Sequence, residues 1–280
     1  MERRGRELVR RIRLITRRRL NTYFSGEYHS AFRGQGLLFD SVREYQYGDD
    51  VRSIDWNVSA RMNHLFVRQY IEERELSVVL AVDLSASGLF GSSREKSEAL
   101  LEAAGLLLYL ARMNNDRVSV LLFTDRIEKY MAAGKGRTFV SAVLDEIIGF
   151  VPEGRGTDIY GALDFLGRVL KKRSVIFVLS DFLDEGYETR LRHLNRRHDV
   201  IPVVVSDPLE RAMPLYGLTE FEDMETGERF LTEAVPGMTG GPADPGIGRI
   251  DISTDEPLEK PFIRFFEQRN RAYRSGGARR

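Results

Sequence analysis

Apolar and polar residues follow one another along this chain in blocks, which become regular from about residue 76 onward. The short apolar runs 78–82 and 175–179 have the length and composition of strands that are buried on both faces of a sheet. Between them, residues 94–113 carry apolar side chains at helical spacing. Strands that alternate with helices in this way predict a parallel sheet that is covered by helices on both faces.

The regular blocks define a set of expected elements. Strands are expected at 78–82, 117–123, 127–131, 175–179, 200–205 and 250–253, and helices at 94–113, 139–148, 159–170, 187–196 and 256–269. The predicted fold class is α/β, with a doubly wound and mostly parallel sheet and a smaller mixed extension at the N-terminus. A stretch at 233–248 is rich in glycine and proline, cannot hold a helix, and is predicted to be a loop.

The chain divides into four predicted segments. A basic amphipathic helix is expected over 1–20, and a mixed extension with several glycine turn signals over 21–75. The α/β domain is expected over 76–270, and a basic tail over 271–280.

Composition narrows the class of protein. The 280 residues, of which 42% are hydrophobic, suffice for one large packed domain and an extension. The 42 basic and 42 acidic residues balance, so no overall field attracts a polyanion. There is no cysteine, which rules out disulfides and thiol chemistry and is compatible with a reducing cytoplasm. The longest uncharged apolar run, 103–111, is shorter than the roughly 20 residues that span a bilayer, so a soluble protein is expected.

The basic N-terminal segment admits three interpretations. It can pack on the body of the protein through Leu8, Ile12 and Ile15, which recur at helical spacing among arginines. The same arrangement suits a helix that lies on an anionic membrane surface. Nucleic-acid binding is the least supported, because arginine attracts phosphates but no base-reading motif accompanies it.

Candidate chemistry begins where the first strand ends, in the sequence Asp83-Leu84-Ser85-Ala86-Ser87. This pattern places a carboxylate and two hydroxyls at the carboxyl tip of a central strand, where open α/β sheets bind their ligands. Three oxygen ligands around one turn suit a hard divalent cation such as Mg²⁺. Alone the pattern is weak, because Asp and Ser commonly form turns and cap helices at strand ends.

Two later segments strengthen the case for a metal site. The glycine-rich sequence at 154–158 opens a helical stretch and supplies Thr157, while Ser180-Asp181 ends another apolar strand. Together they add a hydroxyl and a carboxylate from neighbouring crossover loops. This order of motifs resembles the metal-ion-dependent adhesion site of von Willebrand factor A domains.

The resemblance implies a division of roles in which hydroxyls hold the ion directly and carboxylates act largely through bound water. The direct ligands of Mg²⁺ or Mn²⁺ would be Ser85, Ser87 and Thr157, and the water-mediated ligands Asp83 and Asp181. Few anionic ligands leave the ion electrophilic, so an open position can accept an Asp or Glu carboxylate of a partner. The neighbouring Asp158 ranks below these five, because it can cap the next helix instead.

The segment before the first metal-site strand is similar to a bacterial family. It reads Arg43-Glu44-Tyr45, then Gly48-Asp49-Asp50-Val51-Arg52, then Ile54-Asp55-Trp56. This run looks like the family catalogued as domain of unknown function fifty-eight, whose members carry a von Willebrand A-like domain. The similarity extends from roughly residue 20 to 232 and resumes at 252–255. One departure is the loop at 233–248, which stands where similar proteins carry a basic amphipathic helix.

Acidic and basic residues alternate between 43 and 61 and allow two interpretations. One is a turn that is held by ion pairs and anchored by Trp56, the only tryptophan of the chain. The other is a partner surface, because Trp, Tyr and Arg are enriched at interface hot spots. The sequence leaves both open.

These observations favour a metal-dependent protein-interaction module rather than an enzyme. No histidine base accompanies Ser85, which argues against a Ser-His-Asp hydrolase. The alternative is a Mg²⁺-dependent phosphoaspartyl hydrolase or phosphotransferase that uses Asp83, although such enzymes carry a second acid where this chain has Ser85. The family resemblance implies two partners, a MoxR-type AAA+ ATPase and an unidentified client protein, in a chaperone-like maturation system. The expected location is cytoplasmic, with attachment to the inner membrane surface through residues 1–20 as an alternative.

Overall fold

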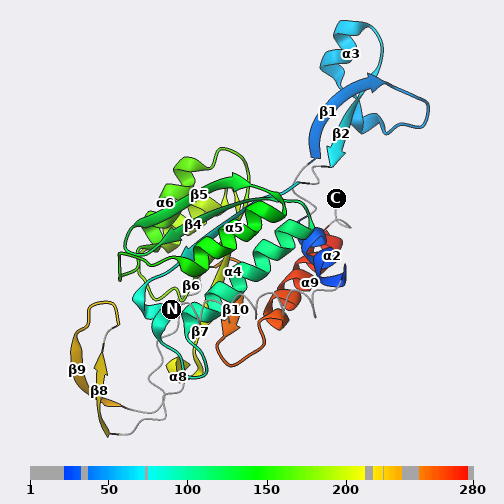
Figure 1. The fold of residues 1–280 in the computed structure, drawn as a ribbon. Coiled ribbons are helices and arrows are strands. Elements are labelled where there is room, and N and C mark those ends of the chain that lie inside the picture. The colour runs from blue at the N-terminus through cyan, green and yellow to red at the C-terminus, as the bar shows by residue number, and fades with distance from the viewer. Residues whose placement is uncertain are drawn as a thin grey trace.

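A computed structural model describes residues 22–32, 37–72, 75–211, 217–222, 224–234 and 246–276. Within these ranges, six strands form the main sheet in the order β10-β7-β6-β3-β4-β5 (Figure 1). They are β3 (Ser77–Asp83), β4 (Arg117–Phe123), β5 (Ile127–Gly134), β6 (Val175–Ser180), β7 (Asp199–Ser206) and β10 (Ile250–Ser253). Strand β5 runs antiparallel to β4 at one edge, and the other neighbours pair in parallel. The predicted α/β fold class is confirmed.

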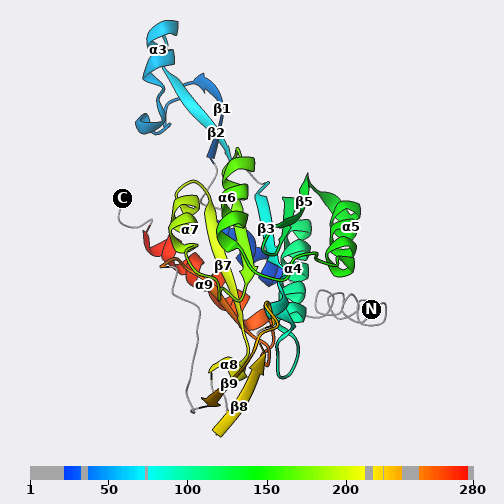
Figure 2. The ribbon, with the colours of Figure 1, turned by 90° about the vertical axis from the view of Figure 1, so that its left-hand side faces the viewer.

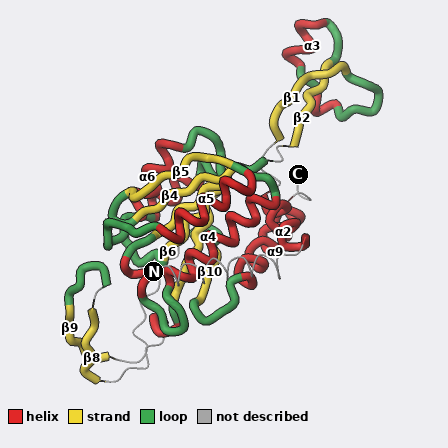
Figure 3. Tube along the Cα trace, in the orientation of Figure 1, coloured by secondary structure: helices red, strands yellow, loops and turns green. Residues whose placement is uncertain are grey.

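Helices cover both faces of this sheet (Figure 3). One face packs against α2 (Thr22–Phe32), α4 (Lys96–Met113), α5 (Gly136–Gly149) and α9 (Glu259–Gly276), and the other against α6 (Ile159–Val169) and α7 (Glu188–Asn195). Successive side chains of a strand point to opposite faces, so Leu80 enters the first core and Val79 and Ala81 enter the second. Burial on both sides explains why β3 is an unbroken apolar run in the sequence.

The predicted elements lie close to their expected bounds. The last strand occupies 250–253 as predicted, and the first long helix begins at Lys96 rather than at residue 94. The closing helix begins at Glu259 instead of residue 256, because Pro257 disfavours a helical conformation of the residue before it.

Helices α2 and α9 pack together, although they lie near opposite ends of the chain (Figure 1). The ring of Tyr28 makes edge contacts with Phe32 and Phe266, with centroids 5.1 and 5.6 Å apart. The Tyr28 hydroxyl also donates a hydrogen bond to Asp116 at 3.2 Å. The contact between Tyr28 and Phe266 therefore joins two helices from distant parts of the chain on this side of the fold.

An arm projects from the body at the end where β3 begins (Figures 1 and 2). It consists of the antiparallel strands β1 (Leu37–Glu44) and β2 (Phe66–Glu72), with the 3₁₀ turn η2 (Val51–Ser53) and the helix α3 (Trp56–Met62) between them. Arg43 pairs with Asp49 at 2.6 Å, and Asp55 caps α3 and pairs with Arg68 at 3.0 Å. The Arg43–Asp49 pair fits the predicted ion-paired turn, whereas Asp55 pairs with a residue outside 43–61. Trp56 is 62% exposed, so its predicted role as an anchor is wrong.

A second hairpin, which the sequence pattern did not predict, lies at the opposite end of the molecule from the arm (Figures 1 and 2). It consists of the antiparallel strands β8 (Gly217–Glu222) and β9 (Arg229–Ala234) and follows the short helix α8 (Pro208–Arg211). Its second strand reaches into the start of the predicted loop at 233–248.

Some predictions fall on parts of the chain that the structure does not describe. The predicted helix over 1–20 lies outside the described residues, as does 235–245 within the predicted loop. The predicted basic tail begins inside α9, which continues to Gly276. Among the described helices, none combines the length and the apolar character that crossing a bilayer requires.

Candidate metal-binding site

The predicted metal ligands lie on loops at the carboxyl edge of the sheet, and Asp83 occupies the innermost position. It is the last residue of β3 and is 4% exposed. Its Oδ2 accepts a hydrogen bond from Ser180 Oγ on the neighbouring strand β6 at 2.6 Å, and its Oδ1 accepts one from the backbone N–H of Ser85 at 2.9 Å. Both carboxylate oxygens are therefore held in fixed directions.

Ser85 and Ser87 lie on the turn that follows. The 3₁₀ turn η3 (Ala86–Leu89) begins directly after Ser85 and brings the two hydroxyl oxygens to 3.0 Å from each other. Two oxygens this close can contact a single small cation. The structure thus brings together the hydroxyls that the sequence spacing predicted.

The loop that carries Thr157 is bonded to this turn. The backbone N–H of Ala86 donates to the carbonyl of Arg155 at 2.8 Å. Asp158 is the N-cap of α6 and accepts a hydrogen bond from the backbone N–H of Gly161 at 2.7 Å. The capping role considered for Asp158 is confirmed, and Thr157 lies between two residues whose positions are fixed by hydrogen bonds.

Asp181 follows β6 and is 4% exposed. Its Oδ2 accepts a hydrogen bond from the buried Nζ of Lys96 at 2.7 Å, and the same ammonium donates to Glu210 Oε1 at 2.7 Å. Burial disfavours the charge on Lys96, but the two carboxylates outweigh burial, so the pKa of Lys96 is raised above its ordinary value. Lys96 therefore fixes one oxygen of Asp181, a contact that the sequence did not predict.

The electrostatics around Asp83 favour a cation. Burial, and then repulsion from the Asp181 carboxylate, raise the pKa of Asp83 to about 7, and hydrogen bonds from Ser180 and Ser85 offset only part of this rise. A divalent cation beside the two carboxylates would favour their charged forms. The repulsion between the two carboxylates, which contributes to the raised pKa of Asp83, would be offset by such an ion.

The kinds of donor at this edge also fit a hard divalent cation. Mg²⁺ prefers oxygen ligands and retains several of its waters. Within the described ranges, no three His, Cys, Asp or Glu side chains gather in a way that could hold a metal ion by themselves. The hydroxyl oxygens of Ser85, Ser87 and Thr157 are the further oxygen donors that the sequence analysis assigned to the ion.

A further carboxylate reaches the same loop from the second hairpin. Glu225 lies in the turn between β8 and β9, and its Oε1 accepts a hydrogen bond from Thr157 Oγ1 at 2.8 Å. Thr157 and Glu225 are 68 positions apart, so no local pattern indicates their contact. Gly227, which lies in the same turn, has a φ of 75°, a backbone conformation that favours glycine.

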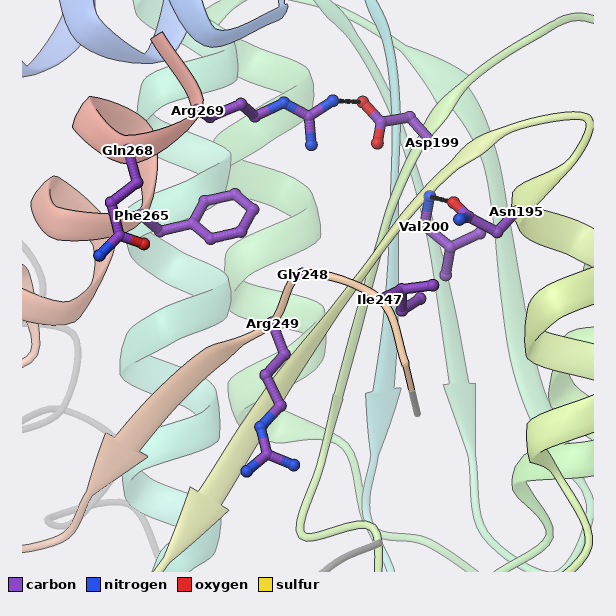
Figure 4. Close-up of a pocket in the computed structure, with 9 residues that line it drawn as sticks. All are labelled: Asn195, Asp199, Val200, Ile247, Gly248, Arg249, Phe265, Gln268 and Arg269. Atoms are coloured by element: carbon purple, nitrogen blue, oxygen red, sulfur yellow. Dashed lines mark hydrogen bonds and ion pairs between the residues drawn. The ribbon is translucent and has the colours of Figure 1, made fainter. Parts of the chain in front are cut away.

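A separate hollow of about 490 Å³ lies near the amino end of β7 (Figure 4). Its wall is formed by Asn195, Asp199, Val200, Ile247, Gly248, Arg249, Phe265, Gln268 and Arg269. Asp199 and Arg269, both in this wall, form an ion pair, and Arg249 pairs with Asp251 at 3.0 Å. Strand β7 runs from this hollow to the carboxyl edge, so the hollow is not part of the predicted metal site.

Comparisons with known proteins give a family and several relatives. The family described as "Protein of unknown function DUF58" matches residues 41–235. The uncharacterized proteins Rv1480 of Mycobacterium tuberculosis and Mb1516 of Mycobacterium bovis are each 32% identical over 223 residues, which cover 78% of this chain and 70% of theirs. Among solved structures, the conserved hypothetical protein BatB from Bacteroides thetaiotaomicron shares 19% identity at a TM-score of 0.47. An aerotolerance-related membrane protein from Bacteroides fragilis shares 18% sequence identity at a TM-score of 0.46. Each of the two matches covers 70% of this chain and 99% of the matched chain.

Proposed function

The chain belongs to the family described as "Protein of unknown function DUF58", and we propose that it is a metal-dependent protein-interaction module with a von Willebrand A-like adhesion site. The observation that carries this proposal is the pair of hydroxyl oxygens of Ser85 and Ser87, 3.0 Å apart beside the buried Asp83. Hydroxyls and carboxylates in such a group are the ligands of a hard cation. Mg²⁺ or Mn²⁺ is the expected ion.

Each residue of the site has a distinct task in this proposal. The hydroxyls of Ser85, Ser87 and Thr157 contact the ion. Because these ligands are neutral, they do not neutralise the positive charge of the ion. Asp83 and Asp181 accept hydrogen bonds from waters around the ion and balance its charge at a distance. When bound, the ion supplies an electrophilic position that accepts a carboxylate oxygen from an acidic residue of a partner protein.

The surrounding residues keep this arrangement rigid. Ser180 holds one oxygen of Asp83 at 2.6 Å, and Lys96 holds one oxygen of Asp181 at 2.7 Å. Because both carboxylates are fixed before any ligand arrives, little reorganisation is needed when a partner binds. Such preorganisation favours the binding of a partner's carboxylate.

The identity of the partners is proposed from the family resemblance alone. A MoxR-type AAA+ ATPase and a client protein are the expected partners, in chaperone-like maturation of that client. The expected location is cytoplasmic, and the basic segment at 1–20 offers a means of attachment to an anionic membrane surface.

Affinity capture from the native cell tests the interaction. The intact chain should retain an AAA+ ATPase or its client in Mg²⁺ and lose it when a chelator is added. A Ser85→Ala, Ser87→Ala double variant should lose it too, whereas Ser174→Ala should retain it. Ser174 is a matched control because its buried hydroxyl lies before the amino end of β6, away from the site. Equal retention by the double variant would refute a role for the metal site in binding.

A further inference from the structure

The second hairpin places one of its own carboxylates at the predicted metal site. Glu225 is partly buried in the turn between β8 and β9, and its Oε1 accepts the hydrogen bond of Thr157 at 2.8 Å. Thr157 is one of the three hydroxyl residues assigned to the ion. An acidic side chain of this protein therefore lies beside the ligand set at which the proposed function requires an acidic side chain of a partner.

The hairpin contacts three consecutive residues of the Thr157 loop. Besides the bond to Thr157, Arg155 Nη2 donates to the carbonyl of Met224 at 3.3 Å. The other carboxylate oxygen of Glu225, Oε2, lies over Gly156, only 3.6 Å from where a side chain at that position would begin. The turn is thus seated on the loop by both its backbone and its acidic side chain.

The chemistry of this contact is compatible with a shared cation. A threonine hydroxyl has one proton to donate and two lone pairs to offer. In the observed contact Thr157 gives its proton to Glu225, which leaves its lone pairs available to a metal ion. A carboxylate that accepts a hydrogen bond from a ligand atom lies in the shell around that ligand, and carboxylate oxygens are themselves ligands that hard cations prefer.

We propose that Glu225 is an internal ligand of the metal site, which an acidic side chain of the partner must displace before it can bind. This inference rests on the proposed function. It identifies the chemistry of the incoming group, a carboxylate on a side chain that can enter beside Thr157. It also gives the β8–β9 hairpin a role as a competitor that keeps weak carboxylates out of the site.

Water bound to Mn²⁺ reports directly on this competition, because the paramagnetic ion accelerates the relaxation of protons in its coordinated waters. With three hydroxyl ligands and Glu225, about two of six positions remain for water, and loss of Glu225 makes that about three. Glu225→Ala should therefore raise the water-proton relaxivity of bound Mn²⁺ by about one half. Glu228→Ala, which removes an exposed carboxylate from the same turn, should leave it unchanged.

Acetate serves as the probe for the incoming carboxylate. It should lower the relaxivity of the Glu225→Ala protein toward that of the wild type, and should leave the wild type and Glu228→Ala unaffected at the same concentration. If Glu225→Ala fails to fold by circular dichroism, Glu225→Gln makes the same prediction, because a neutral amide is a weaker ligand for a hard cation.

The outcomes separate the two proposals. Tight Mn²⁺ binding with equal relaxivity and equal acetate response in all three proteins would overturn the role of Glu225 and leave the metal site standing. No Mn²⁺ binding in any of them would overturn the metal site and the role of Glu225 together. A rise in relaxivity confined to the Glu225 variants supports both.

Discussion

Ser180 donates its hydroxyl proton to Asp83 at 2.6 Å, across two neighbouring strands of the sheet. This contact joins the carboxyl ends of β3 and β6, where parallel strands meet at one edge. It orients a buried carboxylate whose pKa is raised to about 7 by burial and by Asp181. The protein environment thus disfavours the ionised form of Asp83, and a bound cation would favour that form again.

Lys96 should be essential for stability as well as for the site. Its buried ammonium bridges Asp181 and Glu210, at 2.7 Å from each. Lys96→Met would leave the buried carboxylate of Asp181 without this cation, and loss of one member of a buried ion pair costs about 3–5 kcal/mol. Urea unfolding should show a loss of this size in the free energy of unfolding.

The matched control is Lys129→Met. Lys129 pairs with Glu146 at 2.6 Å, but both side chains are exposed, 42% and 40% respectively. Exposed pairs contribute about 0–1 kcal/mol, so this variant should unfold at nearly the wild-type urea concentration. Similar losses in the two variants would show that the Lys96 bridge is no stronger than a surface pair.

Asp116 should make the stability of the fold depend on pH. Burial raises the pKa of Asp116 to about 6, and the hydrogen bonds that it accepts from the backbone N–H of Leu76 and from the Tyr28 hydroxyl only partly oppose this rise. Between about pH 4 and pH 6 the folded protein keeps a proton that the unfolded chain releases, so the free energy of unfolding falls as pH rises through that window. Above it this contribution stays constant.

Asp116→Asn removes that titration and isolates its effect. Unfolding in urea at several pH values should show the wild type losing on the order of 2 kcal/mol relative to the variant as pH rises from about 4 to about 7. Any hydrogen bond lost to the amide adds an offset that does not vary with pH. Parallel curves for the two proteins would contradict the raised pKa of Asp116.

The central strands of the main sheet were predictable because they are buried on both faces. The predicted strand at 175–179 and the strand β6 nearly coincide. A strand that is buried on both faces is an uninterrupted apolar run, so its limits can be read from the sequence. The hairpin of β8 and β9 gave no such signal. It lies outside the sheet, and Leu231 in its second strand is 66% exposed, so apolar residues there do not mark a buried face.

The candidate site was predictable only where its residues are close in sequence. Asp83, Ser85 and Ser87 form a local motif, and the turn η3 that follows Ser85 sets the positions of the two serines. Lys96 and Glu225 reach the site through contacts with residues 85 and 68 positions away, which depend on how the helices and hairpins pack. A single sequence contains no local pattern for such contacts.

The protein should show no phosphatase or ATPase activity that depends on Asp83. Both oxygens of Asp83 already accept hydrogen bonds, from Ser180 and from the backbone of Ser85, and the side chain is almost fully buried. A phosphoaspartyl enzyme needs that carboxylate as an accessible nucleophile. Incubation with Mg²⁺ and p-nitrophenyl phosphate or ATP should release no phosphate above the level of Asp83→Asn. Hydrolysis that disappears in Asp83→Asn would favour the phosphoaspartyl alternative.

The most direct test of the account is calorimetric titration of Mg²⁺ into the purified protein, followed by thermal unfolding at saturating metal. The wild type should bind one ion, and a concentration about 100 times the dissociation constant should add about 2.7 kcal/mol to the free energy of unfolding. The Ser85→Ala, Ser87→Ala double variant should show neither heat nor stabilisation, while Ser174→Ala should behave like the wild type. Equal binding and equal stabilisation of the double variant would contradict the assignment of this edge of the sheet as a metal site.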